Sequence, residues 1–127
     1  MIENDMEFEH KDLTYQIIAA AFEVHNVLGY GFLENVYEKS LVKELSSKGI
    51  KAETQTGIKV EYKGEEVGLY FADVVVNGEI ILELKAVEAL SKAHEAQLLN
   101  YLKATNKRIG ILINFGKDKV EYKRFIL

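Results

Sequence analysis

Three charged residues lie within stretches of the sequence that are otherwise apolar. Asp73 precedes the run Val74-Val75-Val76, and Glu83 and Lys85 flank Leu84 in the run that follows. Successive side chains of a strand alternate between its two faces, so Glu83 and Lys85 project together while Leu84 points into the core. Desolvating an ionised side chain is costly unless the group is paired or binds a metal. This pattern indicates either a metal site or a salt bridge at a strand end open to water.

The spacing of Asp73 and Glu83 suits a metal site. Asn77-Gly78 lies between them and is typical of a tight hairpin turn, which brings the two carboxylates near each other. A magnesium site needs such carboxylates from adjacent strands and leaves its other positions to water and phosphate. A slip of one residue in register would separate them. The alternative, in which Glu83 and Lys85 pair in water at a frayed strand end, stays open on these residues alone.

Several other polar residues have ordinary structural interpretations. Isolated histidines such as His25 and His94 are more often packed or exposed than metal ligands. Tyr37 falls on an apolar helical stripe, so it is either a core residue whose hydroxyl reaches a polar partner or a catalytic residue. Glu38 is expected to be a solvated charge on the same helix.

Apolar periodicity predicts the elements that would position these residues. Helices are expected over residues 13–28, 33–48 and 92–104, with Asp12 and Ser91 as the N-caps of the first and third. Strands are expected over 59–62, 67–76, 80–87, 109–114 and 120–126, with turns at Lys63-Gly64 and Asn77-Gly78. The order ααβββαββ predicts an α/β fold, a mixed central sheet flanked by helices.

Composition limits the classes of protein. The 127 residues suffice for one domain, expected over 12–127, with a mobile acidic segment at 1–11. The lack of cysteine excludes disulfides and thiolate-bound metals, so oxygen or imidazole must hold any metal. No apolar run is long enough to cross a bilayer, so no membrane is expected and the cytoplasm is the expected location.

Charge is distributed unevenly along the chain. The net charge of −4 argues against a protein that grips a polyphosphate, but residues 1–85 carry −8 and residues 86–127 carry +4. The basic residues of the second part are either a nucleic-acid-binding face or ordinary solvated charges.

Taken together, these motifs resemble a known group. Asp73 followed by Glu83-Leu84-Lys85, between helices, resembles the PD-(D/E)XK nuclease superfamily, which has a restriction-endonuclease-like core. The segment from Gly31 to Tyr37 is similar to the motif that names the GxxExxY protein family within that superfamily. Gln97 and Tyr101 resemble the QxxxY element of RecB-type nucleases. The proline that often precedes the first acid is absent, since Ala72 stands there.

The resemblance implies a role for each of these residues. Asp73 and Glu83 would be the main ligands of Mg²⁺ or Mn²⁺, with the backbone carbonyl of Leu84 as a further ligand. Glu34 would complete the acidic cluster directly or through water, and Lys85 would orient or activate the attacking water. Tyr37, Gln97 and Tyr101 would be accessory residues, and the last two would support Lys85 or a phosphate.

The function implied by the resemblance is metal-dependent hydrolysis of phosphodiester bonds, with DNA as the expected nucleic acid. The alternative is a nuclease fold retained as a nucleic-acid-binding or protein-binding module, with a weak or unused metal site. The acidic first half of the chain favours this alternative. A chain this small has little surface for recognising sequence, which points to a homodimer or a subunit of a larger assembly.

Overall fold

The computed structural model describes residues 2–127, with side chains from His10 onward. The elements follow the predicted order: α1 (Ile2–Leu28), α2 (Glu34–Ser47), β1 (Ala52–Tyr62), β2 (Glu65–Val76), β3 (Ile80–Lys85), α3 (Lys92–Thr105), β4 (Ile109–Asn114) and β5 (Glu121–Ile126). None of the described helices is both long and apolar enough to span a bilayer.

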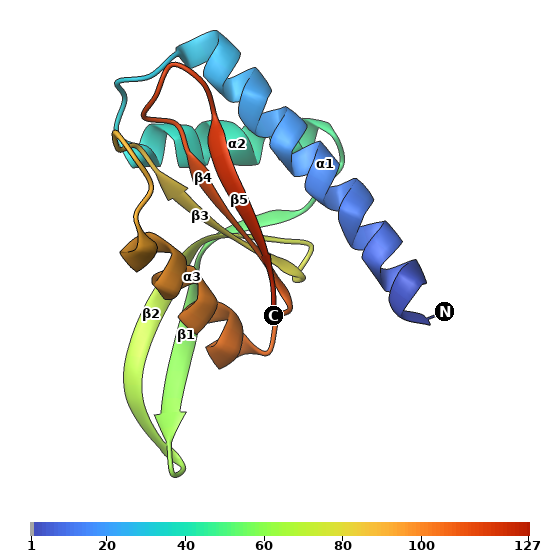
Figure 1. The fold of residues 1–127 in the computed structure, drawn as a ribbon, viewed down its shortest axis with the longest axis vertical. Helices are drawn as coiled ribbons and strands as arrows, with labels where there is room; N and C mark the ends of the chain where they lie inside the picture. Colours follow the sequence, from blue (N-terminus) through green and yellow to red (C-terminus); the bar gives the residue numbers. More distant parts are fainter. Residues whose placement is uncertain (1) are drawn as a thin grey trace.

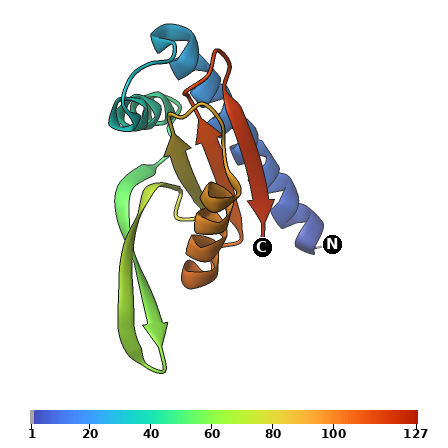
Figure 2. The ribbon, with the colours of Figure 1, turned by 60° about the vertical axis from the view of Figure 1, so that its left-hand side comes forward.

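The five strands form one mixed sheet in the order β1-β2-β3-β4-β5. Neighbouring strands run antiparallel except β3 and β4, which are parallel and are connected through α3. Helices α1 and α2 cover one face of the sheet and α3 covers the other (Figures 1 and 2). The predicted α/β architecture is therefore confirmed.

The core has two parts, one on each side of the sheet. Ile17, Leu41 and Leu82 belong to the part beneath α1 and α2, whereas Ile81 and Leu98 belong to the part beneath α3. All side chains of β4 are buried, as are those of β3 from Ile80 to Leu84. Strands covered on both faces read as continuous apolar runs, which explains why Glu83 stands out there.

Local signals in the sequence account for most element ends. Asn77 and Gly78 have φ values of 52° and 67°, and the N–H of Glu79 donates to the carbonyl of Val76 at 2.9 Å, so the predicted tight turn forms. The hydroxyl of Ser91 accepts from the N–H of His94 at 3.2 Å and caps α3. Both predictions are confirmed.

The start of α1 differs from the prediction. The helix begins at Ile2 and not near Leu13, so Asp12 lies inside it and accepts a hydrogen bond from Gln16 at 3.0 Å. Asp12 is a good capping residue, but a helix can pass through a capping residue when the preceding residues are also helical. The mobility expected for residues 1–11 stays a prediction.

Two strand boundaries also differ. Strand β3 ends at Lys85 and not at Val87, and β1 begins at Ala52, earlier than the alternating residues 59–62 suggested. Ile58 is the one buried residue of β1, so the strand carries little apolar periodicity by which its start could be predicted.

Strands β1 and β2 extend beyond the rest of the sheet. Strand β2 pairs with β3 only over Val74–Val76, whereas it pairs with β1 along almost its whole length. The remaining parts of β1 and β2, residues 56–71, form a two-stranded arm that projects past α3 at the bottom of Figure 1. We call this segment the arm, and the point where β2 leaves β3 the fork.

Candidate active site

Asp73 and Glu83 lie at the fork. The last paired residues of β2 and β3 are Val74 and Leu82, so Asp73 and Glu83 occupy the next opposed positions. Beyond the last paired residues, backbone N–H groups of one strand approach carboxylates of the other instead of backbone carbonyls. The N–H of Leu84 donates to Asp73 Oδ2 at 2.8 Å, and the N–H of Asp73 approaches Glu83 Oε1 at 3.4 Å. The hairpin thus brings the two carboxylates together as predicted.

An irregularity in β1 accompanies the fork. Thr54 pairs with Val74 and Thr56 pairs with Ala72, which leaves Gln55 unpaired opposite Asp73 with a φ of 51°. A positive φ is uncommon for a residue other than glycine and departs from the extended conformation of a strand. Ala72 packs in the core beneath α3 while Val74 packs beneath α1 and α2, although residues two apart normally share a face. Strand β2 therefore changes its orientation at Asp73.

Helix α2 contacts β1 at this irregularity. The side-chain amide of Gln55 donates to Glu38 Oε1 at 3.1 Å. Glu38 was expected to be a solvated charge, and an exposed hydrogen bond is compatible with that expectation. The contact is exposed, and it connects α2 to the residue that faces Asp73.

The charge on Glu83 is strongly disfavoured. The residue is only 4% exposed. Burial, and next the negative charge of Asp73, raise the pKa of Glu83 from 4.5 to about 8. Lys85 lowers this pKa, but by less. Glu83 in the metal-free protein is therefore mostly protonated at neutral pH.

Lys85 ends β3 beside this pair and is half-buried. In the part of the chain that the structure describes, neither carboxylate of the fork forms an ion pair with Lys85. The salt-bridge interpretation that the sequence left open is therefore not what the structure shows.

The segment after Lys85 is fixed to β4. The carbonyl of Lys85 accepts from the N–H of Phe115 at 2.8 Å. The buried Asn114 amide accepts from the N–H of Val87 at 3.0 Å and donates to its carbonyl at 2.9 Å. Gly116 lies so close that a Cβ there would come within 2.3 Å of the Val87 backbone. These contacts hold the backbone at and after Lys85 against the end of β4.

Helix α3 presents Gln97 and Tyr101 toward the fork. Gln97 Nε2 donates to the Tyr101 hydroxyl at 2.9 Å, so the two residues share one helical face as predicted. Burial, and then the charge of Glu83, raise the pKa of Tyr101. Tyr101 thus lies within electrostatic reach of Glu83. Support for Lys85 or a phosphate stays a prediction for both residues.

Tyr37 lies in the core and holds the loop before α2. Its hydroxyl donates to the carbonyl of Gly29 at 2.7 Å and accepts from the N–H of Phe32 at 3.2 Å. Its ring stacks on Phe115, with centroids 4.6 Å apart. Of the two interpretations from the sequence, the buried tyrosine with a polar partner is the one observed.

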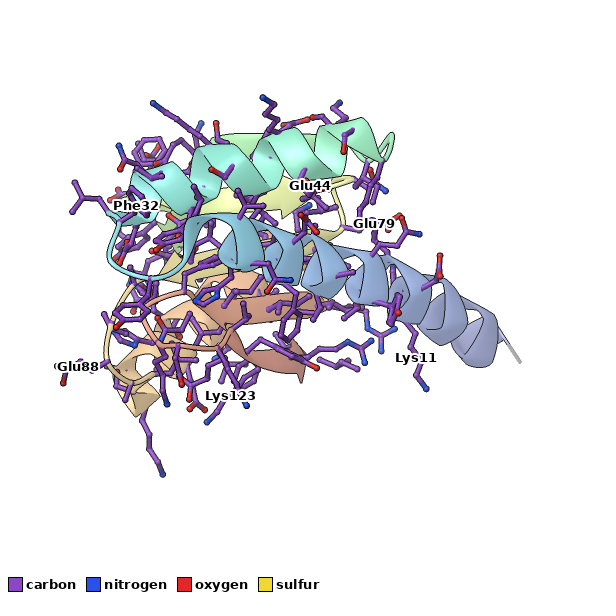
Figure 3. The ribbon with its side chains drawn as sticks, turned by 90° about the horizontal axis from the view of Figure 1, so that it is seen from above. Lys11, Phe32, Glu44, Glu79, Glu88 and Lys123 are labelled. Carbon is purple, nitrogen blue, oxygen red and sulfur yellow. The ribbon has the colours of Figure 1, made fainter. Side chains whose placement is uncertain are left out.

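In Figure 3, Phe32 of this loop and Glu88 of the loop after β3 lie at the same end of the molecule.

Glu34 begins α2 and is exposed. Within residues 10–127, no group of three or more histidine, aspartate or glutamate side chains is placed to hold a metal ion. The structure therefore brings Asp73 and Glu83 together without Glu34. A contribution of Glu34 through water stays a prediction.

His25 and His94 have structural roles. Nε2 of His25 lies 2.7 Å from the carbonyl of Lys117, and its ring stacks near Phe115. Nδ1 of His94 accepts from the N–H of Ser91 at 3.1 Å and completes the cap of α3.

Three residues near the site were not found from the sequence. Gln55 and Glu38 carry no signal, because the interrupted pairing at Gln55 depends on the neighbouring strand, which the sequence does not reveal. Asn114 could have been suspected, since a buried strand with a polar last residue is unusual.

The donor set fits a divalent cation of the kind that prefers oxygen. Asp73 and Glu83 would supply two carboxylates. The N–H and C=O of one strand residue point to the same edge, so the carbonyl of Leu84 faces the fork as its N–H does. The pKa of the buried Glu83 is raised in part by the negative charge of Asp73, and a bound cation would relieve this repulsion.

The chain belongs to the PD-(D/E)XK nuclease superfamily, whose family model matches residues 11–125. Among solved structures it is similar to one titled "Crystal structure of SSO0001", with 20% identity and a TM-score of 0.57. The match covers 72% of this chain and 48% of that one, so the chain spans about half the length of that relative. At this identity the likeness concerns the fold alone. No curated protein matches. Membership of the GxxExxY family stays a prediction.

Proposed function

We propose that this chain is a metal-dependent nuclease that hydrolyses phosphodiester bonds, with DNA as its substrate and Mg²⁺ or Mn²⁺ as its cofactor. The observation that supports the proposal most directly is the pair of carboxylates at the fork, which lie side by side, with Glu83 buried and neither carboxylate paired with Lys85. A cytoplasmic location belongs to the same proposal.

Each residue of the site has a task in such a reaction. Asp73, Glu83 and the carbonyl of Leu84 would hold the metal, which when bound supplies charge neutralisation and a more acidic water. The ammonium of Lys85 would donate to a phosphate oxygen and stabilise the negative charge that develops there. Burial of Glu83 excludes bulk water, so these electrostatic interactions are weakly screened.

A second candidate function is a binding module without catalysis. The absence of a third acid beside Asp73 and Glu83 among the described residues favours it, as does the net charge of −4. Two of the later basic residues also pair with acids of this chain, Lys117 with Glu121 and Lys123 with Glu95. A module of this kind would hold nucleic acid or protein without cutting it.

A cleavage assay distinguishes the two functions. Purified wild-type protein is incubated with single-stranded DNA, duplex DNA and RNA, with Mg²⁺, Mn²⁺ or chelator. We expect metal-dependent cleavage of DNA. Lys85→Ala should retain the fold and reduce the rate roughly 100- to 1,000-fold, which is typical for loss of one group that stabilises transition-state charge.

The matched control is Lys48→Ala, which removes an exposed lysine at the end of α2 and should cleave as the wild type does. A difference in rate between Lys48→Ala and Lys85→Ala, prepared in the same way, also excludes a contaminating nuclease. A contaminant would cleave equally in both preparations. Equal cleavage by wild type and Lys85→Ala, or no cleavage of any substrate with either metal, would contradict the nuclease proposal.

A further inference from the structure

A groove runs between the arm and α3, and its lining includes none of the residues proposed to hold the metal. The arm contributes Val60 and Tyr70 to its lining, and α3 contributes Gln97, Asn100, Tyr101 and Lys103. Its volume is about 790 Å³, which is ample for a nucleotide. We call it the arm groove.

The arm groove shares Gln97 and Tyr101 with the candidate active site. Tyr101 and Gln97 line the groove, and the same Tyr101 lies within electrostatic reach of Glu83. The ring of Tyr70 approaches that of Tyr101, with centroids 5.8 Å apart and a tilt of 42°. Tyr70 stands three residues before Asp73 on β2, so a ligand against Tyr70 would lie within about 10 Å of the fork.

The lining combines an aromatic surface with amides and a cation. Tyr70 is 50% exposed, although it lies beside α3. Aromatic rings bind bases through their flat faces, and the amides of Gln97 and Asn100 can bond to base edges. Lys103 supplies a positive charge for a phosphate. This set matches the parts of a nucleotide, whereas a peptide would need backbone partners along a strand edge or a deep apolar pocket.

Base pairing decides which nucleic acid can use this surface. Bases within a duplex are stacked and paired, so their faces are not free to stack on a tyrosine. An unpaired nucleotide presents its face without that cost.

We propose that the arm groove binds an unpaired nucleotide beside the phosphodiester to be cut, so that the enzyme acts on single-stranded DNA or frayed ends. This inference rests on the proposed nuclease function, because it names the substrate class of the same site. Tyr70 is the stacking residue, and the arm places it opposite α3.

Binding in chelator tests the groove without any cleavage. Fluorescence anisotropy measures the Kd of a short labelled single strand and of the matching blunt duplex. Tyr70→Leu keeps an apolar side chain against Tyr101 and removes the aromatic face. It should weaken binding of the single strand roughly 5- to 150-fold, the loss expected for one stacked base, and should leave duplex binding unchanged.

Two variants serve as controls. Tyr70→Phe retains the ring and should bind the single strand as the wild type does. Tyr62→Ala removes an exposed tyrosine at the tip of the same arm, outside the groove, and should also bind normally. A 2-aminopurine base in the oligonucleotide adds a spectroscopic readout, since its fluorescence should be quenched by stacking in the wild type, Tyr70→Phe and Tyr62→Ala, but not in Tyr70→Leu.

The outcomes separate this inference from the nuclease proposal. Tyr70-dependent binding of single strands without cleavage in any metal would support the groove and contradict the nuclease. Metal-dependent cleavage with equal binding by wild type and Tyr70→Leu would contradict the groove and leave the nuclease intact. Equal affinity of the wild type for single strand and duplex, or no binding of either, would also overturn the groove proposal.

Discussion

A carboxylic acid removed from water holds its proton more tightly, and Glu83 shows this effect at the fork. Its neighbour Asp73 adds a second negative charge at close range, which strengthens the effect. The protein retains this unfavourable pair although apolar residues would pack there without penalty. Functional sites are where such perturbed carboxylates concentrate.

This arrangement predicts that the metal-free protein loses stability as the pH rises. The pKa of Glu83 is about 8 in the folded state and near 4.5 when unfolded, so the folded state binds the proton more tightly between these values. The stabilisation is fully present below pH 4.5 and is lost as the pH rises through 8. Because one pKa unit corresponds to about 1.4 kcal/mol, the loss is on the order of several kcal/mol.

Glu83→Gln removes this dependence. The uncharged amide resembles the protonated acid, so we expect the variant to melt close to wild type at pH 4 and several degrees higher at pH 9, in chelator. Glu61→Gln, at an exposed position of the arm, is the control for general effects of charge. A Glu83→Gln protein that melts well below wild type at both pH values would show that the carboxylate is a structural partner.

At the scale of elements, the loop after β3 is held by a close approach that only glycine allows. A methyl group on Gly116 would collide with the backbone of Val87, and backbone cannot move aside as a flexible side chain can. We expect Gly116→Ala to lower the free energy of unfolding by about 1–3 kcal/mol, as overpacking does. Because this loop follows Lys85, cleavage should fall as well.

Gly57→Ala is the matched control for this prediction. A Cβ at Gly57 would meet only side chains of Leu69 and Phe71, at 3.7 and 3.8 Å, which is ordinary contact. Its stability in urea should equal or exceed that of the wild type, since alanine restricts the unfolded chain more than glycine. If Gly116→Ala is as stable as Gly57→Ala, the loop is not fixed as described.

The sequence predicted those elements whose causes are local. Asn77-Gly78 specified its turn and Ser91 its helix cap, because turn and cap chemistry depends on a few adjacent residues. The start of α1 was predicted wrongly at Asp12, because no nearby residue distinguishes an N-cap aspartate from an aspartate inside a longer helix.

The fork could not be predicted in the same way. It depends on where β2 leaves β3 and on an unpaired residue in β1, and both are set by tertiary pairing. Asp73, Glu83 and Lys85 were found because charges stand out in apolar strands. Gln55 and Tyr70 were not, because polar and aromatic residues are unremarkable on a half-exposed arm.

At the scale of the whole molecule, the fold divides its tasks between the two faces of the sheet. Helices α1 and α2 bury one face and carry the loop that Tyr37 closes, while α3 and the arm enclose the groove on the other (Figure 2). The carboxylates lie where these two regions meet. The expected dimer or larger assembly stays a prediction.

The central claim is that the fork brings Asp73 and Glu83 to one metal ion. Calorimetric titration of Mn²⁺ into wild type, Asp73→Ala, Glu83→Gln and the exposed control Glu66→Gln tests it most directly. We expect one ion per chain in the wild type and in Glu66→Gln, and a large loss of affinity in both variants of the fork, because each removes one of the two carboxylate ligands. Uptake of Mn²⁺ by Asp73→Ala and Glu83→Gln with wild-type affinity would contradict the claim.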